Sequence, residues 1–139
     1  MTATDPSQSS PQTSGKAKMS KLAIAGWVVS VLPSLILLMG GGMGIIHPDA
    51  VTKGNEHIGF PDHLSLPLGI TVIISVLLYL FPRTAVFGAI MLTGYLGGAT
   101  AAHVRIEEPF LFPVIFGVVI WAGLVMRDEK VRAVLPLRK

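Results

Sequence analysis

The side chains best suited to chemistry gather at the ends of long apolar stretches. His47, His63 and His103 each stand beside such a stretch. The connections nearby also carry His57 and five carboxylates: Asp49, Glu56, Asp62, Glu107 and Glu108. Converging imidazoles and carboxylates can bind a divalent metal or ligate haem iron, and imidazole changes charge near neutral pH. We therefore take His47, His63 and His103 as candidate metal ligands, with a pH sensor as the alternative.

Tyr95, His103 and Arg105 form a second candidate group. Tyr95 lies inside the apolar stretch 84–102, and the other two residues follow the end of that stretch. A tyrosine inside a membrane generally bonds its hydroxyl to a neighbouring helix, and contact with a quinone-like ligand is the alternative. If these three side chains share a pocket, they are the candidate catalytic residues of a quinone-linked oxidoreduction.

The sequence also excludes several kinds of chemistry. It has no cysteine, which rules out disulfides, thiol redox chemistry, iron–sulfur ligation and covalent haem attachment. It contains no dinucleotide-binding or phosphate-loop glycine motif, no His-Glu-x-x-His and no Gly-x-Ser-x-Gly. The apolar stretches hold no charged residue or histidine, whereas proton pumps and ion-coupled transporters normally keep one there. A pump is therefore disfavoured.

Four uncharged stretches must position these side chains. Each reaches the ~18 residues that are typical of a transmembrane helix. The chain is 51% hydrophobic and only 14% charged, too few polar residues to coat a soluble core of this size. We predict an all-α fold, a bundle of four transmembrane helices running up, down, up and down. The predicted helices cover residues 22–46, 64–81, 84–102 and 109–126.

The first stretch is predicted to be an uncleaved helix. It is longer than the ~7–15 residue core of a signal peptide and is not followed by a small-x-small cleavage site. Pro33 stands near its midpoint and predicts a bend. Such a bend in a small bundle could open a cavity for a lipid or another small apolar molecule.

Basic residues predict the orientation. Nine of the eleven Lys and Arg lie in segments 1–21, 82–83 and 127–139, and only Lys53 and Arg105 lie in the other two connections. Lys and Arg near helix ends are retained in the cytoplasm, so both termini should be cytoplasmic. Residues 47–63 and 103–108 are then external loops. We expect the lipid bilayer as a partner and no nucleic acid.

The membrane domain, residues 21–127, lies between two tails. Residues 1–20 are rich in Ser, Thr, Gln and Pro and predict a disordered cytoplasmic segment, because they have little apolar surface to bury. Residues 128–139 form a basic cytoplasmic tail. This tail either rests on anionic lipid or serves as a charged stop to translocation.

Small residues recur four apart in the third stretch. They include Gly94, Gly97, Gly98, Ala101 and Ala102, and Gly94-x-x-x-Gly98 matches a packing motif of transmembrane helices. Small side chains let helix backbones approach closely. We therefore expect this helix to pack at the centre of the bundle, with formation of a homo-oligomer as the alternative use of the same face.

Several short motifs occur together in a characteristic order. Gly59-Phe60-Pro61 precedes the second stretch, which ends at Pro82, and Gly97-Gly98-Ala99 is followed by His103. The chain then ends with Leu124-Val-Met-Arg-Asp and a basic tail. This series resembles the DoxX-like family of small bacterial four-helix membrane proteins, over about residues 22–138. The resemblance implies a bacterial inner-membrane location and an association with thiosulfate or quinone oxidation or with redox defence.

These observations favour a non-catalytic inner-membrane protein that is an accessory or anchoring subunit of a quinone-linked redox system. Its expected partner is a membrane-associated redox enzyme. The residues themselves assign no cofactor, and quinone is the one that this hypothesis implies. One alternative is a carrier of lipid or of small apolar molecules. The other is an oxidoreductase with an outer-face site built on Tyr95, His103 and Arg105.

Overall fold

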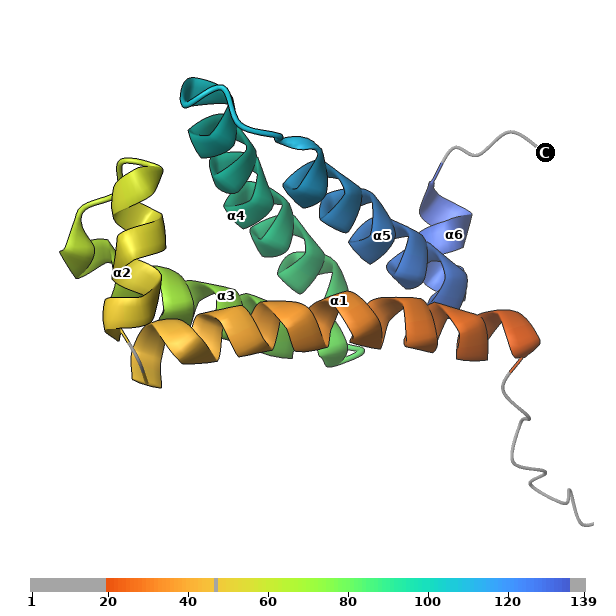
Figure 1. Ribbon diagram of the computed structural model, residues 1–139. Coiled ribbons are helices and arrows are strands. Elements are labelled where there is room, and N and C mark those ends of the chain that lie inside the picture. Colours follow the sequence, from red (N-terminus) through yellow and green to blue (C-terminus); the bar gives the residue numbers. More distant parts are fainter. Residues whose placement is uncertain (1–19, 47, 136–139) are drawn as a thin grey trace, which may run out of the picture.

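The computed structural model describes residues 20–46 and 48–135, and these are almost entirely helical (Figure 1). Within these ranges there is no β-strand, so the predicted all-α class is confirmed. His47, and the tail prediction for residues 1–19, lie outside the described residues. The elements are α1 (Lys21–Ile46), α2 (Pro48–His57), η1 (Asp62–Leu64), α3 (Ser65–Leu80), α4 (Ala85–Arg105), α5 (Leu111–Arg127) and α6 (Glu129–Val134).

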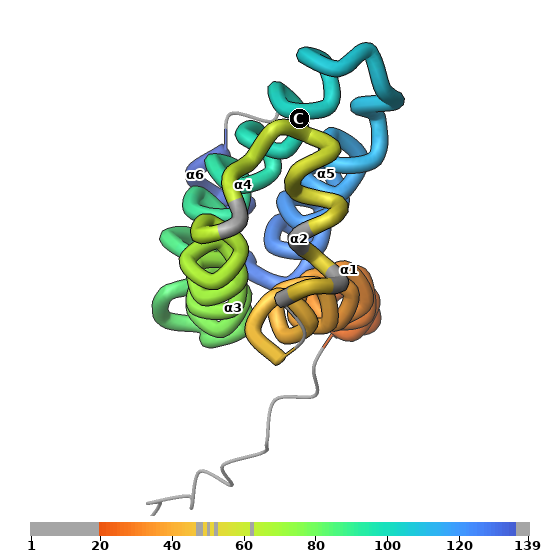
Figure 2. The backbone as a smooth tube through the Cα atoms, turned by 60° about the vertical axis from the view of Figure 1, so that its left-hand side comes forward, coloured from red at the N-terminus to blue at the C-terminus, as the bar shows by residue number. Residues whose placement is uncertain are grey.

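Four long helices, α1, α3, α4 and α5, form a ring. The helix α1 packs against α3 and α5, and α4 packs against the same two helices from the other side. Figure 1 shows α4 and α5 inclined to α1, and Figure 2 shows the same helices from another side. These helices lie at the positions expected from the uncharged stretches. By length and composition α1 and α4 can cross a membrane, whereas α3 and α5 are shorter apolar helices.

The predicted external loop 47–63 is largely helical, which corrects the sequence analysis. Helix α2 and the single-turn helix η1 occupy most of it. Asp49 in the first turn of α2 and His57 in its last turn suit the helix dipole. The tail also begins with a helix, α6, whose N-cap Asp128 accepts hydrogen bonds from the backbone N–H groups of Lys130 (2.9 Å) and Val131 (3.3 Å). A polar segment without an apolar run can therefore form a short helix, because capping side chains satisfy the backbone groups at its end.

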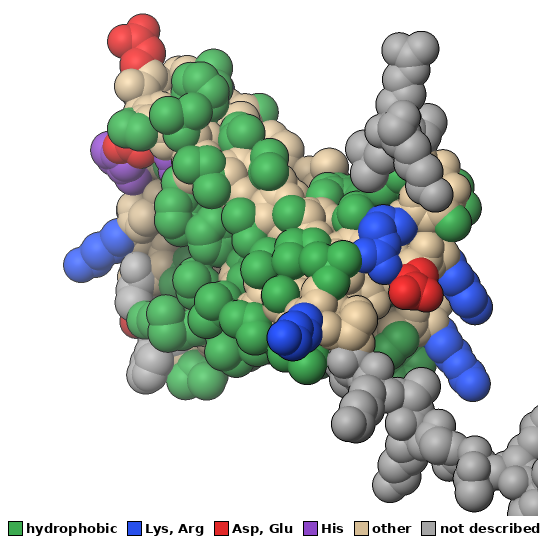
Figure 3. Space-filling model, turned by 90° about the vertical axis from the view of Figure 1, so that its right-hand side faces the viewer, with side chains coloured by type: hydrophobic (Ala, Val, Ile, Leu, Met, Phe, Trp, Pro, Cys, Tyr) green, Lys and Arg blue, Asp and Glu red, His purple; other side chains and the backbone are tan. Residues whose placement is uncertain are grey.

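The long helix α1 turns its small residues inward and its large apolar ones outward. Leu32 is 60% exposed and Met39 is 65% exposed. Figure 3 shows hydrophobic side chains across the middle of one face, with His at its upper left and most of the visible Lys and Arg at its lower right. This distribution is typical of membrane helices, where lipid covers the apolar surface. The buried residues of α1 are Gly26, Ser30, Pro33, Ser34, Gly41 and Gly44.

The tightest packing surrounds Tyr79 of α3. Its ring is fully buried, and its hydroxyl donates to the Ile120 carbonyl at 2.8 Å and bonds the Ser30 hydroxyl at 2.8 Å. A Cβ atom added at Gly88 would collide with the backbone of Tyr79, and one added at Gly123 would lie 2.5 Å from the Ser30 hydroxyl oxygen. These glycines therefore allow α4 and α5 to approach their neighbours at backbone distance.

The expectation that the third long helix packs at the centre through its glycines is wrong. Gly94, Gly97 and Gly98 are exposed, and a Cβ atom at any of them would have no atom within 4 Å. Ala101 is also exposed, and only Ala102 of the predicted row is buried. A four-membered ring has no central helix. Close small-residue contacts involve α1 and the first turns of α4, where Ala85, Gly88 and Ala89 are buried.

Pro33 is accommodated inside α1 without ending the helix, and it is buried. The Ser34 hydroxyl donates to the Ser30 carbonyl oxygen at 2.7 Å, in the turn that contains Pro33. The cavities described below are lined by other residues.

Candidate functional site

A cavity of about 450 Å³ lies between α3, α4 and residues 55–60, which begin in the last turn of α2. We call it the α3–α4 cavity. Its volume is within the range of pockets that hold small organic ligands. Its walls are mainly apolar and include Ile58, Phe60, Leu68, Met91 and Ala99. Three polar side chains, Asn55, Thr71 and Tyr95, complete the lining.

Two glycines of α4 make room for this cavity. Gly94 and Gly98 line it one helical turn apart, on either side of Tyr95. Because a Cβ at either position would meet nothing within 4 Å, the space above them is open rather than filled by a neighbouring helix. The motif that predicted helix packing therefore provides an accessible backbone surface at a cavity wall.

The polar side chains of the cavity differ in what they can offer a ligand. The Thr71 hydroxyl donates to the Pro67 carbonyl at 2.7 Å, and the Asn55 amide donates to the Ser65 hydroxyl at 2.8 Å. The Thr71 hydrogen is therefore engaged, whereas the Asn55 amide keeps a second N–H, and both side chains retain oxygen lone pairs as acceptors. The Tyr95 hydroxyl makes no hydrogen bond to another side chain or carbonyl of the described chain. The Tyr95 hydroxyl is thus free to bond a polar group in an otherwise apolar site.

The segment covering the cavity is tied to the end of α4. Arg105 donates from Nη2 to the Ile58 carbonyl oxygen at 2.6 Å, and His57 Nε2 lies 2.7 Å from Glu108 Oε1. Gly59 adopts a φ of 76°, and the Arg105 guanidinium lies directly against it, so a larger residue would be strained there. These contacts hold Ile58 and Phe60 over the cavity. We call residues 55–60 the cover segment.

The structure separates the predicted catalytic residues. Tyr95 lines the cavity. Arg105 instead bonds the Ile58 carbonyl of the cover segment and lines a smaller neighbouring hollow with Phe60 and Ala102. His103 Nδ1 lies 2.8 Å from the Ala99 carbonyl oxygen, in its own helix, and His103 does not line the α3–α4 cavity. The expected joint site of Tyr95, His103 and Arg105 is therefore not formed.

The predicted metal centre is not formed by the described residues either. Among them, no three His, Asp or Glu side chains lie close enough together to hold a metal ion. His63 is exposed in η1, and His103 is bonded within α4. His47 lies outside the described residues.

Sequence reasoning missed Asn55, Ile58 and Thr71 as cavity residues. Asn55 and Ile58 belong to a polar segment, and no local sequence pattern predicts that this segment covers the end of the ring. Thr71 had a usable signal, because it is one of few polar residues in its apolar stretch. Of the motif residues behind the family resemblance, Gly59 and Phe60 lie in the cover segment, Pro61 follows it, and Pro82 lies at the opposite end of the ring.

Comparison with known families gives one match, in which the profile of the DoxX-like family aligns with residues 28–123. The chain belongs to the DoxX-like family. The aligned region of this DoxX-like protein runs from α1 into α5 and includes every residue that lines the α3–α4 cavity. Neither curated proteins nor solved structures gave a match. The resemblance predicted from the sequence is confirmed, and the segment from Leu124 onward lies beyond it.

Proposed function

We propose that this DoxX-like protein binds a small apolar molecule with a polar head group in the α3–α4 cavity. The observation that carries the proposal is a cavity of about 450 Å³ with apolar walls and one uncommitted tyrosine hydroxyl. A head group would bond Tyr95, with the oxygens of Asn55 and Thr71 as further acceptors. The apolar part would lie along Leu68 and Met91. Quinones and lipids both have this chemistry.

The proposal includes a multi-pass placement in a bacterial inner membrane with both termini in the cytoplasm. The outward-facing apolar side chains of α1 support burial in lipid, and the nine-to-two distribution of Lys and Arg supports the orientation. The helix α3 has 16 residues, a length of about 24 Å at ~1.5 Å per residue. It is short for a ~30 Å hydrocarbon layer, and the apolar residues Leu64 and Phe81 extend it at either end.

Binding is a better-supported role than catalysis. None of the residues that line the cavity is charged, and Tyr95 is the one titratable group among them. General acid–base chemistry at neutral pH normally uses groups that titrate nearer that pH. The ligand class then decides the biological role. A bound quinone would favour the accessory role beside a redox enzyme, and a bound lipid would favour a carrier.

Native mass spectrometry of the full chain in mild detergent tests the proposal with two probes, decylubiquinone and oleic acid. We expect one of them to be retained by the wild type and lost in Gly98→Leu, because the leucine would fill the cavity. Gly97→Leu is the matched control. Gly97 is equally open and on the same helix, but it faces the groove beside α5. Absence of retention in the wild type, or equal retention by both variants, would overturn the proposal.

A further inference from the structure

Arg127, at the end of α5, is held in an unusual environment. Its Cζ lies 4.5 Å from the ring centroid of Trp27 and 4.5 Å from that of Tyr79, so the guanidinium sits between two aromatic faces. Nη2 donates to the Tyr79 carbonyl oxygen. Nη1 is buried and has no hydrogen-bond partner in the part of the chain that the structure describes. Buried guanidinium N–H groups are normally paired, so Nη1 has an unused donor.

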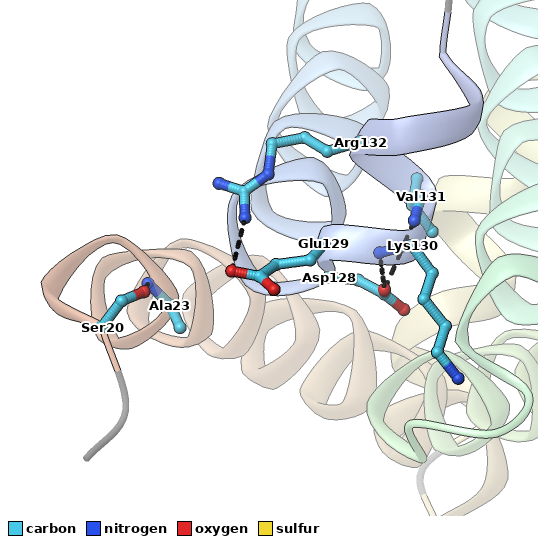
Figure 4. A network of polar contacts seen from close by, with 7 residues as sticks. All are labelled: Ser20, Ala23, Asp128, Glu129, Lys130, Val131 and Arg132. Atoms are coloured by element: carbon cyan, nitrogen blue, oxygen red, sulfur yellow. Dashed lines mark hydrogen bonds and ion pairs between the residues drawn. The ribbon is translucent and has the colours of Figure 1, made fainter. Parts of the chain in front are cut away.

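The acids next to Arg127 in sequence lie near it but are engaged with other groups. The Asp128 carboxylate caps α6 by accepting from two backbone N–H groups, and Glu129 pairs with Arg132 at 3.6 Å (Figure 4). Within residues 20–46 and 48–135, Arg127 forms no ion pair. The site therefore has a fixed cation with capacity for an anion.

Two adjoining hollows lie at this end of the ring, and Arg127 lines the first of them. The first, which we call the inner cavity, measures about 520 Å³ and is lined by Trp27, Arg127, Lys130 and Arg132 together with Ser20, Ala23, Pro82, Asp128 and Glu129. The second, the inner groove, measures about 820 Å³ and is lined mainly by apolar side chains, among them Val86, Trp121 and Val131. Pro82, Asp128 and Lys130 line both hollows. A polar site and an apolar site are thus continuous.

We propose that this end of the ring binds an anionic phospholipid, with its phosphate in the inner cavity and an acyl chain in the inner groove. Arg127 Nη1 and the Lys130 ammonium are the phosphate donors, with Arg132 at the rim. The groove favours a lipid over free phosphate, because inorganic phosphate would leave its apolar walls unused. The site lies at the opposite end of the ring from the α3–α4 cavity and shares with the proposed function only the membrane placement.

The test uses the full chain in mild detergent and compares phosphatidylglycerol, phosphatidylcholine and inorganic phosphate. Native mass spectrometry should show preferential retention of phosphatidylglycerol, and this lipid should raise the thermal unfolding temperature more than phosphatidylcholine does. Inorganic phosphate should leave that temperature unchanged. Equal retention of the two lipids would overturn the proposal. A shift with inorganic phosphate alone would identify a free anion as the ligand and would also overturn it.

Lys130→Gln provides the decisive variant, because the Lys130 side chain makes no ion pair in the described structure and its loss leaves the packing of Arg127 intact. We expect retention of phosphatidylglycerol to fall about fivefold, as for one basic residue at an anionic surface. Lys21→Gln is the matched control, since Lys21 is exposed at the first residue of α1 and lines neither hollow. Equal losses in the two variants would indicate general surface attraction and would refute a defined site.

Discussion

Tyr79 and Tyr95 belong to adjacent helices of the same ring, yet their surroundings are opposite. Tyr79 is 0% exposed, its hydroxyl is bonded to α1 and α5, and Gly88 packs against its backbone. Tyr95 faces a cavity beside Gly98, where a Cβ would meet no atom within 4 Å. Glycine thus permits close helix contact in one region and leaves ligand-sized space in the other. A glycine motif alone does not distinguish these two uses.

The geometry of the α3–α4 hairpin explains the difference. The two helices are joined by residues 81–84, and near this turn Gly88 lies against the backbone of Tyr79. Figure 1 shows α4 rising away from α3 beyond the turn. The space that opens between them is bridged by the cover segment rather than by another long helix. The tight region therefore supplies stability, and the open region is available for binding.

The largest contrast is expected from alanine at the two kinds of glycine. Gly88→Ala forces a methyl group against the backbone of Tyr79, where neither helix can yield, and should lower the free energy of unfolding by ~2–3 kcal/mol. Gly98→Ala should change it by no more than ~1 kcal/mol and in the stabilising direction, since alanine favours a helix. Thermal unfolding in detergent measures both. Equal destabilisation by the two variants would remove the distinction between the regions.

The next contrast concerns the two hydroxyls. Tyr79→Phe leaves the Ser30 hydroxyl without its buried partner and should cost ~1–2 kcal/mol of unfolding free energy. Tyr95→Phe should leave stability nearly unchanged but weaken retention of the cavity ligand about fivefold, as expected for the loss of one hydrogen bond of ~1 kcal/mol. The same unfolding assay, followed by native mass spectrometry, separates these effects. A large stability loss in Tyr95→Phe would show that its hydroxyl has a structural role.

The smallest effects are expected at the cover segment. Arg105→Gln removes a charge-assisted hydrogen bond to the Ile58 carbonyl and should reduce ligand retention about threefold, at ~0.7 kcal/mol. Glu108→Gln weakens an exposed contact with His57 Nε2 and should change retention by less than about twofold. Dissociation rates of the bound probe measure both changes. If neither variant alters the dissociation rate, the cover segment does not restrict ligand exit.

The parts of the structure that could be predicted are those encoded by long uncharged apolar stretches. The four uncharged stretches correspond to α1, α3, α4 and α5, because a helix pairs all of its backbone groups within one apolar segment. Helix α2 could not be predicted in this way, since its polar sequence carries no burial signal. The cavity depends on the path of α2, so Tyr95 was found as a candidate whereas Asn55 and Ile58 were not.

The packing error at α4 has a clear physical origin. The spacing Gly94-x-x-x-Gly98 shows that one helix face has no side chains, but it does not specify what approaches that face. A row of small residues in α1, Gly26, Ser30 and Ser34, has the same four-residue spacing and is buried. Its serines made it less conspicuous than a row of glycines. Serine in such a row packs as closely as a small residue because its hydroxyl can bond within the bundle, as Ser30 does with Tyr79.

The contact between α1 and α5 also has a consequence for biosynthesis. A Cβ at Gly26 would lie 2.6 Å from the backbone nitrogen of Arg127, so the first and last long helices meet at backbone distance. The ribosome makes α1 first and α5 last among these helices. The inward row of α1, which includes Gly26 and Ser30, therefore has no α5 contacts until most of the described chain has been translated. Under the proposed membrane placement, Ser30 stays exposed to the insertion machinery during that interval, and photo-crosslinking from position 30 in nascent chains of increasing length would record its release.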